Sequence, residues 1–81
     1  MSSMLDMEMP MHLENRVREV RNERDLTQEE LARLVGVTRQ TILAVEKGGY
    51  EPSVRLALVL ASSLAVSVDE LFWLGRARKE S

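Results

Sequence analysis

Apolar positions along the chain recur at helical spacing, and short polar segments separate one apolar group from the next. In the first group, Leu13, Val17 and Val20 fall at positions i, i+4 and i+7, which predicts one apolar stripe on a helix. This helix is expected to run from about Leu13 to Arg24. Asp25 then interrupts the pattern, and aspartate is one of the few residues besides glycine that tolerate a left-handed helix end.

A second helix is predicted to begin at Thr27, because Thr27 and Glu30 have the spacing of a capping box. Gly36 is expected to end it, since a residue without Cβ adopts a positive φ most easily. The side of this helix that faces the core is expected to consist of Leu31, Leu34 and Val35.

A third helix follows Gly36 after a tight turn, and Thr38 is expected to cap it. Its buried side is Ile42 and Val45, and the segment that starts at Lys47 is expected to stop it. Two short helices joined by such a turn form a helix-turn-helix, which can place the start of its second helix in a DNA major groove.

Two more helices are predicted toward the C-terminus. Ser53 is expected to cap a helix from Val54 to Leu64, which is apolar almost all round and is therefore expected to be buried on more than one side. Ser67 and Glu70 form a second capping box, before a short helix from Asp69 to about Leu74. No strand pattern competes with these helices, so the predicted fold class is all-α, with five helices and a central helix-turn-helix.

The 81 residues are enough for one small domain. A chain this short buries only about 60 % of the surface that is exposed when it is unfolded, so its stability is expected to be marginal. We expect this domain at 12–75, a Met-rich leader at 1–11 and a basic tail at 76–81. The leader is expected to be flexible, although alternating methionines could also support an exchanged strand. These methionines are Met4, Met7, Met9 and Met11.

Composition excludes several classes of protein. The chain has no cysteine and one histidine, and it lacks a glycine-rich phosphate loop, so no nucleophile and base can meet and no enzyme, metal site or cofactor is expected. The longest apolar run, Leu56 to Ala61, is far shorter than the roughly 20 residues of a membrane span. Asp6 and Glu8 replace the basic start of a signal peptide, so we expect a cytoplasmic protein without a membrane partner.

The net charge of −2 argues against DNA binding, because Lys and Arg on phosphates supply much of the affinity. The charges are unevenly distributed, however. Asp6, Glu8 and Glu14 lie near the N-terminus, and Arg78 and Lys79 lie near the C-terminus. An acidic face and a basic face can therefore coexist.

From about Leu13 to Trp73 the chain resembles the lambda-repressor and Cro-like DNA-binding domains, specifically the small Xre-type regulators. The resemblance rests on the segments Leu26–Ala32, Gly36–Val37 and Arg39–Ile42, together with Glu46 and the C-terminal segment Val66–Phe72. It implies a transcriptional regulator, most simply a repressor, that binds a palindromic operator as a homodimer with its third helix in the major groove. No small-molecule ligand is expected, since the chain leaves no room for a sensing domain.

The resemblance also implies which residues contact DNA. Arg39 can donate two hydrogen bonds to guanine, Gln40 can make the matching pair with adenine, and Ala44 can place its methyl group against that of thymine. Thr41 and Leu43 lie beside them. The phosphate contacts that we expect are Gln28, Thr38 and Lys47.

The resemblance also implies a structural ion pair, and the apolar residues near the C-terminus predict a dimer interface. Arg21 in the first helix is expected to form a structural ion pair with Glu46 at the end of the third, although both could instead be unpaired surface charges. Phe72 and its two neighbours could close the core or mediate dimer contacts. The predicted dimer interface consists of Leu64, Phe72, Trp73 and Leu74.

One alternative function stays open at this point. Arg39 and Gln40 could be a solvated helix face, and the protein could be an interaction module or an antitoxin-like partner that reuses the fold. Its acidic composition favours that alternative, whereas the polar start of the third helix favours DNA.

Overall fold

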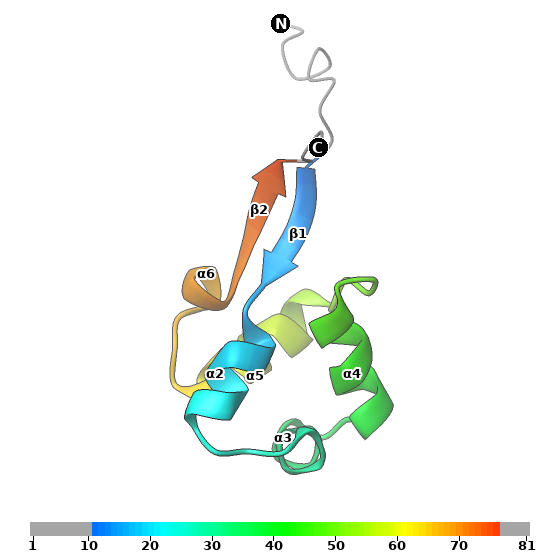
Figure 1. Ribbon diagram of the computed structural model, residues 1–81, viewed down its shortest axis with the longest axis vertical. Helices are drawn as coiled ribbons and strands as arrows, with labels where there is room; N and C mark the ends of the chain where they lie inside the picture. The colour runs from blue at the N-terminus through cyan, green and yellow to red at the C-terminus, as the bar shows by residue number, and fades with distance from the viewer. Residues whose placement is uncertain (1–10, 77–81) are drawn as a thin grey trace, which may run out of the picture.

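The computed structural model describes residues 11–76 of the chain (Figure 1). Five helices follow one another in this part, with one short strand before them and one after them in the sequence. The strands are β1 (Met11–Asn15) and β2 (Phe72–Arg76), and they pair antiparallel. The helices between them are α2 (Val17–Glu23), α3 (Gln28–Val35), α4 (Arg39–Lys47), α5 (Val54–Leu64) and α6 (Val68–Leu71).

The two-stranded sheet corrects the all-α prediction. Leu13 lies in β1 opposite Leu74, and Asn15 lies opposite Phe72, so the first helix begins four residues later than expected and the last helix ends at Leu71. The physical reason is that strand pairing joins segments about 60 residues apart, which local periodicity does not reveal. Figure 1 shows the hairpin projecting away from the helices.

The same hairpin changes the predicted domain limits. Met11, which we expected in the leader, begins β1, and Arg76, which we expected in the tail, ends β2. The rest of the leader, with its other methionines, and the rest of the tail lie outside the described residues.

The predicted helix caps are confirmed. Thr27 and Ser67 each form a complete capping box, and the side chains of Thr38 and Ser53 each accept a hydrogen bond from the backbone three residues later. These caps satisfy amide groups that have no partner within a helix. The left-handed helix ends predicted at Asp25 and Gly36 are also present, with φ values of 58° and 79°.

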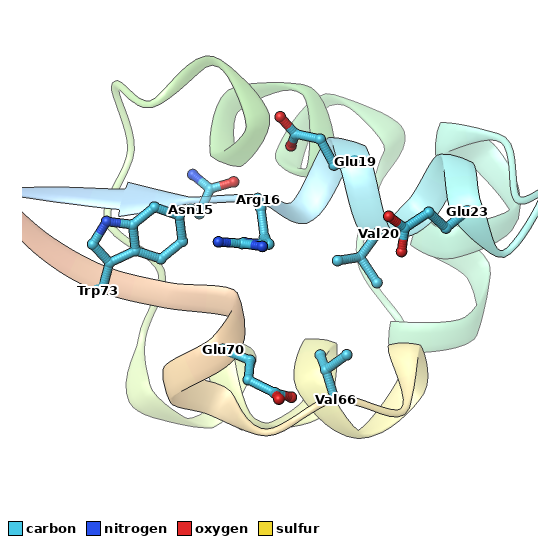
Figure 2. Close-up of a pocket in the computed structure, with 8 residues that line it drawn as sticks. All are labelled: Asn15, Arg16, Glu19, Val20, Glu23, Val66, Glu70 and Trp73. Carbon is cyan, nitrogen blue, oxygen red and sulfur yellow. The ribbon is translucent and has the colours of Figure 1, made fainter.

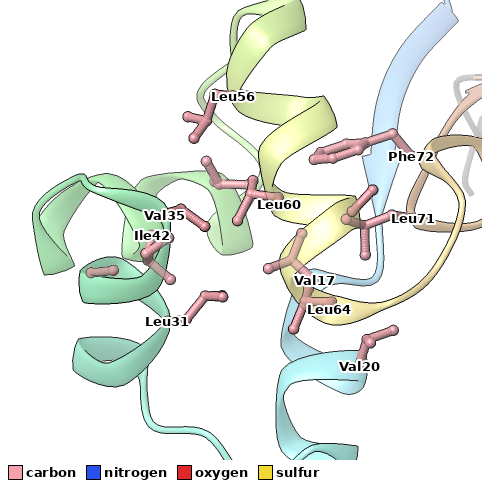
Figure 3. Packing of buried hydrophobic residues seen from close by; sticks show 13 residues of the cluster. Val17, Val20, Leu31, Val35, Ile42, Leu56, Leu60, Leu64, Leu71 and Phe72 are labelled. Atoms are coloured by element: carbon pink, nitrogen blue, oxygen red, sulfur yellow. The ribbon is translucent and has the colours of Figure 1, made fainter.

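One cluster of buried side chains holds the helices together, and Figure 3 shows how α5 lies among them. Leu60 and Leu64 of α5 pack with Val17 of α2 and with Leu71 and Phe72 at the C-terminal end. The full set of buried apolar residues is Val17, Val20, Leu31, Ala32, Val35, Ile42, Val45, Leu56, Leu60, Ala61, Leu64, Leu71 and Phe72.

Burial corrects two of the predicted dimer contacts. Leu64 is fully buried on the core side of α5, and Phe72 is buried where β2 leaves α6, so neither side chain can meet a second subunit. Leu34, which we expected in the core, is 59 % exposed. It precedes Val35 by one position, and successive helical residues point about 100° apart, so Leu34 turns away from the core.

The opposite side of α5 is open rather than buried. Val54 is 77 % exposed and Leu58, one turn later, is 53 % exposed, so the single chain buries α5 on one side only. No helix within residues 11–76 has the length and apolar character that crossing a membrane would require.

Candidate nucleic-acid interface

The helix-turn-helix consists of α3, the turn at Gly36 and α4 (Figure 1). Gly36 takes the left-handed conformation, and the amides of Gly36 and Val37 both donate to the carbonyl oxygen of Ala32, at 2.9 and 3.0 Å. Thr38 then caps α4 by accepting from the amide of Thr41 at 3.2 Å. The turn is therefore closed by its own backbone, and α4 starts at a fixed angle to α3.

One side of α4 is anchored in the core, and its opposite side is available for contacts. Ile42 and Val45 are fully buried beneath the helix. Arg39 and Gln40, at the start of α4, are exposed. Helical spacing places five residues on this outer side, namely Arg39, Gln40, Leu43, Ala44 and Lys47.

The predicted base-contacting residues differ in how accessible they are. Thr41, Leu43 and Ala44 are half-buried, whereas Arg39 and Gln40 are exposed. The hydroxyl of Thr41 lies 3.1 Å from the hydroxyl of Thr38, so it is engaged at the helix cap. The two long polar side chains therefore have the freest access to a ligand.

The C-terminal part of α4 is held by a network of charged and polar groups. Nε of Arg21 donates to Oε2 of Glu46 at 2.7 Å, and Nη2 donates to Oε1 at 3.2 Å. Nη1 of Arg21 donates to the carbonyl oxygen of Leu26 at 2.9 Å. The arginine predicted to pair with Glu46 thus forms a two-pronged contact, and the side chains are only 10 % and 5 % exposed.

Gln28 belongs to this network as well. Its side-chain nitrogen, which we predicted to meet a phosphate, donates to Oε1 of Glu46 at 3.1 Å. The carboxylate of Glu46 therefore accepts two hydrogen bonds from the cationic Arg21 and one from the neutral Gln28. Gln28 therefore joins the start of α3 to the end of α4.

Sequence reasoning missed Asn15. Oδ1 of Asn15 accepts from the amide of Val17 at 3.0 Å, and Nδ2 donates to the carbonyl oxygen of Val45 at 3.0 Å. Asn15 lies one residue before Arg16, the N-cap of α2, and a signal was available, because an asparagine side chain commonly accepts from the amide two residues later in a turn. We instead assigned this position to a helix on the basis of Leu13 and Val17.

A recess of about 510 Å³ lies between α2, α6 and the hairpin (Figure 2). Within it, the guanidinium group of Arg16 lies 5.1 Å from the centre of the Trp73 ring. The residues that line the recess are Asn15, Arg16, Glu19, Val20, Glu23, Val66, Glu70 and Trp73. The lining contains three glutamates and one arginine, an excess of negative charge that is unfavourable for a phosphate.

The fold and the exposed start of α4 together define a helix-turn-helix DNA-binding domain. The model of the helix-turn-helix family HTH_3 matches residues 17–71, and the chain belongs to that family. The predicted resemblance to Xre-type transcriptional regulators is therefore confirmed, and the family is one of regulators rather than enzymes.

Known proteins with similar sequences are named as transcriptional regulators. The HTH-type transcriptional regulator YgzD of Bacillus subtilis (strain 168) is 44 % identical over 62 residues, which cover 76 % of this chain and 94 % of YgzD. The CTXphi transcriptional repressor RstR of Vibrio cholerae is 42 % identical over 70 % of this chain and 51 % of RstR.

A solved structure shares the fold. The restriction-modification controller protein C.AhdI from Aeromonas hydrophila superposes with a TM-score of 0.65 at 39 % sequence identity. The match covers 69 % of this chain and 81 % of C.AhdI.

Proposed function

We propose that this protein is a cytoplasmic repressor that binds a palindromic operator as a homodimer, with α4 of each subunit in the major groove. The observation that carries the proposal is the exposed start of α4, where Arg39 and Gln40 project from a helix whose other side is fixed by Ile42 and Val45. Repression would follow from occupying the promoter. The similarity to RstR, which is a transcriptional repressor, supports that direction of regulation.

The chemistry of the exposed side chains suits base edges. Arg39 can donate a bidentate pair to O6 and N7 of guanine, and Gln40 can donate to and accept from adenine. Ala44, with Thr41 and Leu43 beside it, would supply the apolar contact. Lys47 at the end of α4 and Thr38 at its start would contact phosphates on either side.

The homodimer is proposed because one recognition helix covers only a few base pairs, and two helices about 34–36 Å apart can occupy successive major grooves. The surface that supports it is the open side of α5, with Val54 and Leu58, together with Leu74 of β2, all of which are exposed. Trp73, the preceding residue of β2, points to the opposite face of the strand, where its ring lies over Arg16. Exposed apolar side chains of this size commonly mark an interface. Two-fold symmetry would place the same residues on both sides.

Selection from a pool of random duplexes tests the proposal. We expect enrichment of an inverted repeat whose half-site centres are about 10–10.5 base pairs apart, with two protein chains per duplex in sedimentation. The doubly substituted Arg39→Ala, Gln40→Ala protein is the control and is expected to enrich no sequence. If the parent protein enriches none either, at any salt concentration, the protein is an interaction module that reuses the fold.

A further inference from the structure

Asn15 lies where three parts of the fold meet. It is the last residue of β1 and pairs with Phe72 of β2. Its side-chain oxygen accepts from the amide of Val17 at the start of α2, while its side-chain nitrogen donates to the carbonyl oxygen of Val45 in α4. The following amide, that of Arg16, donates to the carbonyl oxygen of Leu71 at 3.0 Å. The base of the hairpin is thereby bonded both to α6 and to α4.

The bond from Asn15 reaches the C-terminal end of α4, opposite the end that carries Arg39 and Gln40. The carbonyl oxygen of Val45 also accepts from the amide of Gly48, the left-handed residue that ends the helix, at 3.1 Å. The next residue, Glu46, is held by Arg21. Asn15 of β1 therefore holds the backbone of α4 at Val45, and Arg21 of α2 holds the side chain of Glu46.

We propose that Asn15 is a positioning residue for the recognition helix and sets the angle at which α4 presents Arg39 and Gln40. This inference rests on the proposed function. The nine residues of α4 span about 13 Å, so a tilt of about 10° at the end held by Asn15 moves the start of the helix by about 2 Å. Bidentate contacts require positions within about 0.5 Å, so a displacement of that size is enough to break them.

Two substitutions separate this role from the hydrogen bond that Asn15 accepts at the start of α2. Asn15→Asp and Asn15→Ser both keep an oxygen that can accept from the amide of Val17. An ionised aspartate has no proton to donate to the carbonyl oxygen of Val45. The serine hydroxyl can donate, but its oxygen is one bond closer to the backbone than Nδ2 of Asn15, so it lies too far from that carbonyl oxygen. The serine variant adds no charge, so it also controls for repulsion between a new carboxylate and DNA. Ser67→Ala is the matched control, because it removes a helix cap from α6, which makes no hydrogen bond to α4 among those of residues 11–76.

The experiment measures binding to two duplexes, the one that the parent protein selects from random sequence and a random duplex of the same length. We expect Asn15→Ser and Asn15→Asp to bind the selected duplex about fivefold more weakly, the loss that corresponds to one hydrogen bond. For Asn15→Ser, binding to the random duplex should change less than about twofold, because it depends on phosphate charge. Amide exchange at Gly48 should accelerate in both variants and stay unchanged in Ser67→Ala.

Three results would overturn the inference. Parent-like binding by both Asn15 variants would show that α4 does not need this contact. An equal loss in Ser67→Ala would show that general destabilisation lowers the affinity. Unchanged exchange at Gly48 would show that the bond does not hold the end of α4. If the parent protein selects no duplex, the proposed function fails together with this inference, whereas the other results leave the proposed function standing.

Discussion

Removing the carboxylate of Glu46 is expected to destabilise the whole domain. In the native fold this carboxylate accepts from Nε and Nη2 of Arg21 and from the side-chain nitrogen of Gln28, at 2.7, 3.2 and 3.1 Å. Glu46→Ala leaves these three donors without that acceptor. The guanidinium group cannot lose its charge, so a buried cation remains without a counterion.

The exposure of the two side chains sets the expected magnitude. An exposed ion pair is worth at most about 1 kcal/mol, whereas removing one partner of a buried pair costs about 3–5 kcal/mol. At 10 % and 5 % exposure, Arg21 and Glu46 belong to the second class. Arg21 keeps the carbonyl oxygen of Leu26 and the side-chain oxygen of Asn22 as acceptors, so we expect the lower end, about 3 kcal/mol. For a domain of this size, that loss corresponds to a fall in Tm of about 12–24 °C.

Urea unfolding followed by far-ultraviolet circular dichroism measures this loss, at one fixed protein concentration because association shifts apparent stability. Glu51→Ala, which removes an exposed carboxylate from a loop, is the control and should change the free energy of unfolding by at most about 0.5 kcal/mol. A double variant, Arg21→Met with Glu46→Leu, should lose less than Glu46→Ala, because apolar replacement of both partners leaves no unpaired charge.

Either of two results would refute this reasoning. If Glu46→Ala unfolds at the same urea concentration as Glu51→Ala, the pair contributes no more than an exposed one. If the double variant loses as much stability as Glu46→Ala or more, the two side chains do not act as a pair.

Three further predictions concern packing and assembly. Ala65→Gly should raise the free energy of unfolding by about 1 kcal/mol in the same urea experiment, because Ala65 has a φ of 61°; a decrease would show that this position is not strained. Leu60→Ala should cost about 2–5 kcal/mol because Leu60 is fully buried, whereas Leu58→Ala should cost far less, and equal losses would contradict the described core. Leu58→Ala combined with Leu74→Ala, two exposed apolar side chains of the proposed interface, should shift sedimentation from dimer to monomer, and an unchanged dimer would place the interface elsewhere.

The starts of the four helices from α3 to α6 could be predicted from the sequence because the causes of these starts are local. Thr27 with Glu30, and Ser67 with Glu70, satisfy amides within one turn, so residue type and spacing are sufficient. The turn at Gly36 is equally local. The Arg21–Glu46 pair joins distant segments and was available only through resemblance to a known family.

The hairpin could not be predicted in this way because its cause is not local. The spacing of Leu13, Val17 and Val20 suits a helix. Leu13 is instead in a strand because this strand pairs with β2, where Leu74 lies opposite Leu13. The burial of Phe72 has the same cause. Because α6 ends at Leu71 and β2 begins at Phe72, the ring of Phe72 points into the core. Asn15 acquires its second hydrogen bond only after α4 has packed beside the base of the hairpin.

Specific recognition of bases by Arg39 is the central claim, and the affinity of Arg39→Ala for two duplexes tests it most directly. One bidentate contact contributes about 1–3 kcal/mol of discrimination, so we expect binding to the selected duplex to weaken about ten- to hundredfold and binding to a random duplex to weaken much less. Arg33→Ala, which removes the same charge from an exposed position on α3, should not lower the ratio of the two affinities. Equal weakening of Arg39→Ala on both duplexes would contradict base recognition and would assign Arg39 to a phosphate.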